Sequence, residues 1–186
     1  MEAILIIGAI LLVVGVLLVL IYNRLVALRQ TVRQAWSDIE VQLKQRQDLV
    51  PQLVNTVKGY AAHERETFEE VIQARQAAVN ASSVKGQAQA EGLLGQALGR
   101  LFALAEAYPE LKANANFLQL QDKLSDIENK IAASRRFYNN AVQEYNTATE
   151  QFPAVLITGP FNFEPREFFE APEGREMLQT PVEVTF

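Results

Sequence analysis

The chain of 186 residues contains no cysteine and only one histidine, His63. Disulfides, thiolate nucleophiles and thiolate metal sites are therefore excluded, and one histidine cannot build the paired Glu-x-x-His elements of a di-iron bundle. The sequence HERET, which starts at His63, has Thr67 where the zinc-protease motif needs its second histidine. The net charge of −5 also gives no sign of the concentrated basic face that nucleic-acid binding would need. We expect no metal, no cofactor and no nucleic-acid partner.

Signatures of catalysis are equally scarce. No nucleophile elbow occurs, and Gly92, Gly95 and Gly99 lack the Lys-Ser/Thr ending of a phosphate loop. Acidic residues cluster at 64–70 and 122–128, but such runs on amphipathic helices are normally solvated faces. We therefore expect no catalytic residues and no enzymatic activity. The alternative is a ligand-binding protein or hydrolase with an acidic pocket between helices, around Arg46 and the carboxylates near Asp122.

Uncharged apolar residues, in contrast, are abundant at the start of the chain. Ala3 to Tyr22 is twenty residues long without one charge, and it includes Gly8 and Gly15 on one helix face. A helix of ~20 residues, at ~1.5 Å per residue, crosses the ~30 Å of bilayer hydrocarbon. We predict a membrane anchor over residues 1–23, retained rather than cleaved as a signal peptide. The two glycines indicate either close helix packing in an oligomer or ordinary glycine usage in a span.

The flanking charges predict an orientation. Arg24, Arg29 and Arg33 follow the span before any acid, whereas only Glu2 and the amino terminus precede it. Because Lys and Arg near a span are retained on the cytoplasmic side, the N-terminus should lie outside and the rest of the chain in the cytoplasm. We expect the three arginines and Tyr22 to anchor the inner interface.

From Leu25 the apolar residues recur every three or four positions, which predicts helices with one buried stripe. Pro51 lies within this pattern and predicts a kinked or restarted helix. Helix breaks are expected near Gly59 and over residues 82–87, and a last long helix over 109–150. The predicted fold class is all-α, with an elongated antiparallel bundle of about four helices over residues 24–151. Arg46 stands within the stripe, so it should snorkel to the rim or pair with a carboxylate.

Residues 152–186 form a compositionally distinct tail. From Phe152 on it holds five of the seven prolines and six of the ten phenylalanines, so we expect an extended, non-helical segment. Two groups of its residues are candidate interaction residues: Phe161, Phe163, Phe168 and Phe169 as aromatic anchors, and Val182, Val184 and Phe186 as a strand-like alternation. The tail could dock on its own bundle or capture a partner or neighbouring subunit.

Several stretches together resemble one family. They are YNRLVALRQTVRQAWSDIEVQLKQRQDLVPQLVNTVKGYAAHE, ARQAA, YPELKANANFLQLQDKLSDIENKIAASRRFYNNAVQEYN and FFEA. The combination is similar to the LemA family. The resemblance implies a single-pass protein of the bacterial inner membrane with a short outer N-terminus and a helical bundle inside the cell. The family has no established catalytic activity or cofactor, so the resemblance supplies no mechanism, and the family's links to envelope maintenance are indirect.

The leading hypothesis is therefore a membrane-tethered scaffolding or interaction protein. Its expected partners are the lipid bilayer, further copies of the same chain and a membrane or envelope protein. Tethering would favour self-assembly, because copies confined to a membrane surface meet at a raised local concentration.

Overall fold

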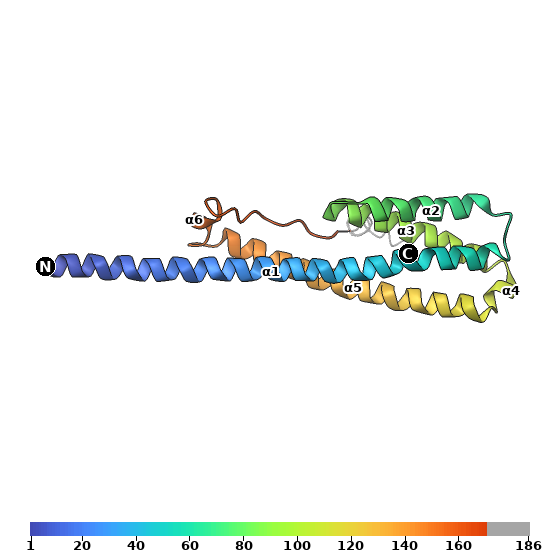
Figure 1. Ribbon diagram of the computed structural model, residues 1–186, viewed down its shortest axis with the longest axis horizontal. Helices are drawn as coiled ribbons and strands as arrows, with labels where there is room; N and C mark the ends of the chain where they lie inside the picture. Colours follow the sequence, from blue (N-terminus) through green and yellow to red (C-terminus); the bar gives the residue numbers. More distant parts are fainter. Residues whose placement is uncertain (171–186) are drawn as a thin grey trace, which may run out of the picture. The chain divides into compact units, whose positions relative to one another are not determined.

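The computed structural model describes residues 1–170, and its regular structure is helical throughout that range, which confirms the predicted all-α class. In chain order the helices are α1 Glu2–Lys58, α2 Arg65–Asn80, α3 Val84–Ala105, α4 Pro109–Lys112, α5 Ala115–Glu150 and α6 Val155–Thr158 (Figure 1).

The chain divides into two compact units, and α1 and α5 contribute to both. Unit 1 consists of Met1–Ser37 and Phe137–Glu167, and unit 2 consists of Asp38–Arg136 together with the described residues from Phe168 on. The proposed anchor, bundle and tail over residues 1–23, 24–151 and 152–186 stay a prediction.

Unit 2 is a bundle of antiparallel helices, in which the end of α1, then α2, α3 and the start of α5 run in alternating directions (Figure 1). Each helix places its apolar residues on one face, as the spacing of three and four predicts. These faces meet in one core, which contains Ile39, Leu43, Val50, Leu53, Val57, Phe68, Val71, Leu94, Leu98, Leu101, Phe117, Leu124 and Ile127.

Local hydrogen bonds set helix starts that periodicity missed. The Oγ of Ser83 accepts a hydrogen bond from the Gly86 N–H at 3.0 Å, so α3 begins at Val84 and most of the expected linker is helical. The Asn114 Oδ1 accepts one from the Phe117 N–H at 3.1 Å. The single helix expected over residues 109–150 is therefore wrong: it is interrupted, and α5 starts afresh after Asn114.

Pro51 lies inside α1, which continues to Lys58 as one helix. A restarted helix is thus not what forms, whereas the predicted end beside Gly59 is confirmed. The proline ring removes one backbone donor, so the carbonyl of Gln47, four residues earlier, loses its usual helical partner.

Unit 1 packs α1, from Leu25 on, against the end of α5, α6 and the segment that follows α6. Its core includes Leu25, Val32 and Ala35 from α1 and Tyr138, Val142, Tyr145, Ile157 and Phe163 from the returning chain. The rings of Trp36 and Tyr138 have centroids 5.4 Å apart. Aromatic and aliphatic burial thus holds the two segments together.

The tail is fixed to α5 by polar contacts with its backbone. The side-chain amide of Asn146 donates to the Arg166 carbonyl at 2.9 Å and accepts from the Arg166 N–H at 2.8 Å. The Tyr138 hydroxyl donates to the Glu167 carbonyl at 2.8 Å. Burial raises the pKa of Tyr138, so this hydroxyl stays protonated and available as a donor.

The tail also contains a correction. The expectation of a wholly non-helical segment is wrong at α6, one helical turn between Pro153 and Pro160. Proline is tolerated just before such a turn because the first N–H groups of a helix have no acceptor within the helix. It is tolerated just after the turn because the helix does not extend beyond that point. Residues 163–170 do run without helix, as expected.

The Asn146 contacts predict how firmly the tail is held. Asn146→Ala removes both hydrogen bonds to Arg166, so trypsin should cut after Arg166 several-fold faster while the helical circular dichroism stays unchanged. The rate is measured by mass spectrometry of the full-length protein in detergent. Gln143→Ala, an exposed change on the same helix, is the control. Equal cleavage rates in the wild type and Asn146→Ala would show that these bonds do not hold the tail.

Candidate functional site

The first candidate site is a buried polar cluster around Arg46 of α1. Arg46 is 5% exposed, and its Nη1 lies 3.0 Å from the Oε2 of Glu91 on α3. Its Nε lies 2.8 Å from the Oε1 of Glu128 on α5, an ion pair without the alignment of a hydrogen bond. Of the two alternatives predicted for Arg46, pairing with a carboxylate is the one that the structure shows.

Glu91 is surrounded by donors. Its Oε1 accepts hydrogen bonds from the side-chain amides of Gln47 at 2.7 Å and Gln87 at 3.0 Å, and its Oε2 accepts one from Arg46. Burial raises the pKa of the Glu91 carboxyl above its ordinary value, while Gln47, Arg46 and Gln87 act in the opposite direction. Both oxygens are thus occupied by groups of the protein itself.

Gly95 makes room for the guanidinium. A Cβ at this position would lie 3.2 Å from the Nη2 of Arg46, closer than most real contacts, so the smallest residue lets α3 approach the arginine. Gly99 is different, because a Cβ there would meet nothing within 4 Å. Close packing therefore explains the glycine at position 95 but not the one at position 99.

Pro51 takes part in the same cluster through the backbone. Because Pro51 has no N–H, the Gln47 carbonyl is left for another donor, and the Nε of Arg75 on α2 donates to it at 2.7 Å. Gln47 thus contacts α3 through its side chain and α2 through its carbonyl. The proline, which the sequence indicates only as an irregularity, allows α2 to bond to α1.

A groove of about 450 Å³ lies beside the cluster, lined by Arg46, Gly95, Leu98, Gly99, Phe102, Gln121, Leu124, Ser125 and Glu128. The side chain of Glu128 is 42% exposed, so it is the carboxylate of the cluster that solvent reaches. Asp122, which the sequence suggested as a member of this pocket, does not line it, and Asp126 instead pairs with Lys130 at 2.6 Å on the surface.

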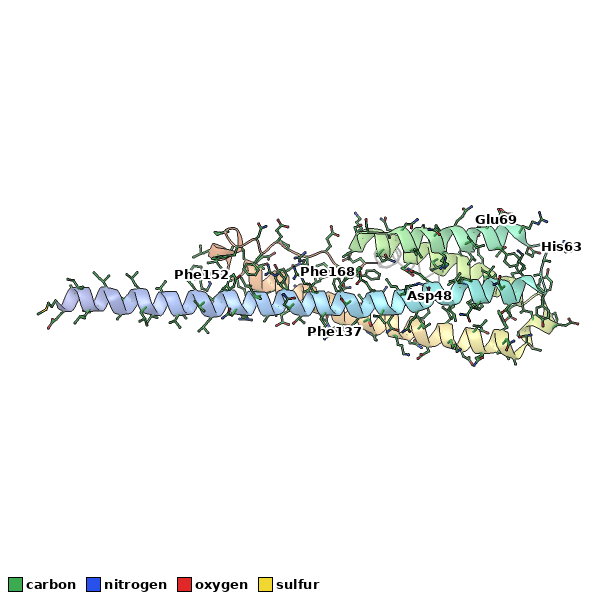
Figure 2. The ribbon with its side chains drawn as sticks, viewed as in Figure 1. Asp48, His63, Glu69, Phe137, Phe152 and Phe168 are labelled. Carbon is green, nitrogen blue, oxygen red and sulfur yellow. The ribbon has the colours of Figure 1, made fainter. Side chains whose placement is uncertain are left out.

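The second candidate site is the apolar start of α1. This helix is the one among the described residues that is long and apolar enough to cross a membrane. Its large side chains are exposed from Ile4, at 74%, to Leu20, at 59%, and Figure 2 shows them projecting from the helix. A Cβ at Gly8 or Gly15 would also meet nothing within 4 Å, so neither glycine serves close packing within this chain.

The tail contacts α1 at Tyr22, the last residue of that apolar run. The centroid of the Tyr22 ring lies 5.1 Å from that of Phe161 and 5.6 Å from that of Phe163, both in edge-on contacts. The guanidinium carbon of Arg29 lies 4.9 Å from the centre of the Phe163 ring, a cation–π contact. Arg29, expected as an interface anchor, is therefore half-buried against the tail, whereas Arg24 and Arg33 are exposed.

The phenylalanines predicted as anchors divide into two groups. Phe163 and Phe169 are buried and Phe168 is half-buried, so this part of the tail docks on its own chain, while Phe161 stays 53% exposed. The strand-like candidates Val182, Val184 and Phe186 lie outside the described residues.

Sequence reasoning missed Glu91 and Gln47, whereas Glu128 belongs to the acidic cluster over 122–128 that the alternative hypothesis placed around Arg46. Glu91 carried a signal, since it stands between Ala88 and Leu94 on the apolar face of its helix, as Arg46 does on α1. Polar residues in two apolar stripes are candidates for a buried pair. No comparable pattern in the sequence indicates Gln47.

Taken together, these features define a helical bundle protein with a buried arginine–carboxylate cluster and an exposed apolar N-terminal helix. The model of the LemA family matches residues 35–186, so the chain belongs to the LemA family. The resemblance predicted from the sequence is confirmed.

Two curated proteins illustrate its relatives. The magnetosome protein MamQ of Magnetospirillum gryphiswaldense is 27% identical over 190 residues, which cover 86% of this chain and 69% of MamQ. The protein LemA of Metamycoplasma hominis is 27% identical over 156 residues, which cover 81% of this chain and 69% of that protein.

The role of Pro51 can be tested with a double-mutant cycle. Arg75→Met leaves the Gln47 carbonyl without its donor and should lower the free energy of unfolding by about 1 kcal/mol. In a Pro51→Ala background the new backbone N–H can satisfy that carbonyl, so the same substitution should cost clearly less. Urea unfolding followed by circular dichroism measures both values. Arg65→Met, on the exposed face of α2, is the control; equal costs of Arg75→Met in the two backgrounds would contradict the coupling.

Proposed function

We propose that this LemA family protein is a membrane-anchored, non-enzymatic scaffolding or interaction protein that self-assembles. The observation that carries the proposal is the exposure of the first part of α1, where the most apolar stretch of 18 residues has no buried residue. A core helix of a soluble protein would bury such residues. Burying one large apolar side chain contributes about 1.5–3 kcal/mol, so leaving this helix in water would be costly and lipid is the better solvent.

The charges beside the helix support one orientation. Arg24 and Arg33 are exposed beyond the apolar run, where cations remain on the cytoplasmic side of a bacterial inner membrane. Glu2 is the only charged side chain on the other flank. The N-terminus is then outside the cell, and both units extend into the cytoplasm apart from the span itself.

Self-assembly is supported by tethering and by exposed apolar residues. Copies on one membrane meet at a raised local concentration. On α2, Ile72 and Val79 are seven residues apart on one helix face and about half exposed, which gives a second copy or an envelope protein an apolar surface to contact.

The non-enzymatic part of the proposal draws on the polar cluster. The Glu91 oxygens accept three side-chain hydrogen bonds, from Arg46, Gln47 and Gln87, so this buried carboxylate serves mainly as the acceptor for donors of the protein itself. The groove beside Arg46 favours a ligand-binding protein as the second candidate. A ligand there would have to compete with Glu128 for the arginine.

The anchor and its orientation are tested by labelling, because the chain has no cysteine of its own. His63→Cys, in the exposed α1–α2 loop, should react with a membrane-impermeant maleimide only after cells are permeabilised. Glu2→Cys should react in intact cells, and both variants should remain in the membrane pellet after an alkaline carbonate wash. Release into the supernatant would contradict anchoring, and the reverse labelling pattern would contradict the orientation.

Self-assembly is tested by energy transfer between donor- and acceptor-labelled His63→Cys protein in lipid vesicles. We expect transfer to persist when lipid is added to dilute the protein, because a specific contact survives dilution. Excess unlabelled wild type should abolish it. If the transfer follows the curve for randomly diffusing monomers at every dilution, the protein is not an oligomer.

A further inference from the structure

The connection between α5 and α6 exposes an unusual set of apolar side chains. Phe152 is 79% exposed, Val155 46%, Leu156 65% and Phe161 53%. In the same segment Ile157 and Phe163 are buried, so the turn uses one set of apolar residues for its own core and presents the other outward. Residues 151–161, QFPAVLITGPF, contain no charge.

The position of this turn is fixed by Tyr22. The Phe161 ring contacts the Tyr22 ring edge-on, with centroids 5.1 Å apart, and Tyr22 ends the twenty-residue apolar run. Figure 1 shows α6 beside the part of α1 where that run ends, and Figure 2 places Phe152 at the same turn. Since all these residues belong to unit 1, their arrangement is internal to one compact body.

Lipid is the occupant that this surface fits. The exposed turn continues the exposed surface of the span, where Leu18 is 41% exposed and Val19 58%. If residues 3–22 cross the hydrocarbon, a group in contact with Tyr22 lies at the depth of the headgroups. Aromatic residues are enriched at that depth. An uncharged apolar turn can enter it without the free-energy cost of dehydrating a charged group.

We propose that the turn from Phe152 to Phe161 inserts into the headgroup region of the bilayer as a second, non-spanning membrane contact. This inference rests on the proposed anchoring of α1. It does not depend on which side of the membrane the bundle occupies. Its consequence is that unit 1 is held against the membrane by two segments far apart in the sequence, so rotation about the axis of α1 is restricted.

The experiment uses the full-length protein in vesicles of phosphatidylcholine with a minor share of phosphatidylglycerol. Single cysteines replace Leu156 in the turn, Leu12 in the span and Phe137 on α5, and each is labelled with the same environment-sensitive dye. Phe137 is the matched control, since it is 52% exposed and apolar in the same unit, yet ~20 Å along α5 from the end of the helix. Lipids with a nitroxide near the headgroup or deep in the acyl chain serve as quenchers.

At Leu156→Cys we expect a blue-shifted emission and several-fold stronger quenching by the shallow nitroxide than at Phe137→Cys. At Leu12→Cys the deep nitroxide should quench more strongly. If Leu12→Cys is quenched and Leu156→Cys behaves like Phe137→Cys, the inference fails while the anchor stands. A blue shift without quenching at Leu156→Cys means contact with protein, such as a second copy, and also overturns it. Absence of quenching at Leu12→Cys removes the anchor itself.

Discussion

The structure depends on one constraint: α1 is a single helix whose two parts need different surroundings. Its first twenty or so residues expose apolar side chains on every face, whereas from Leu25 on most apolar residues lie in one stripe that is buried against protein. A helix satisfies its backbone hydrogen bonds in either environment, so the change of solvent can occur without a break. Because α1 continues through Pro51 to Lys58, its last part belongs to the bundle of unit 2.

Within unit 2 the polar cluster connects every long helix. Arg46 of α1 pairs with Glu91 of α3 and Glu128 of α5, and Arg75 of α2 bonds to the carbonyl that Pro51 leaves unpaired. If only apolar stripes met, one helix could shift by a turn along another at a modest cost in free energy. Here such a shift would leave a buried charge without its partner. The cluster therefore accounts for a defined register of the bundle without any need for a ligand.

Part of this organisation follows from local sequence patterns. The uncharged run, the apolar stripes, the break at Gly59 and the need of Arg46 for a carboxylate could all be predicted, because each depends on neighbouring residues or on the cost of one buried charge. Glu91 and Glu128 could not be assigned as its partners, since they come from other helices and depend on register. The Ser83 and Asn114 caps and the one-turn α6 were missed because short polar contacts decide them.

The same limit applies to the tail, where composition predicted anchoring phenylalanines but not their direction. Asn162 adopts a left-handed conformation, with φ of 58°, and the chain turns there between an exposed Phe161 and a buried Phe163. Asparagine tolerates this conformation better than most residues, so the turn is locally encoded. Burial of Phe163 under Arg29 and Tyr22 then fixes the segment, and Phe161 is left facing outward beside the end of the apolar helix. A residue that closes the core of unit 1 thereby determines which apolar surface unit 1 presents at the depth where the proposed span ends.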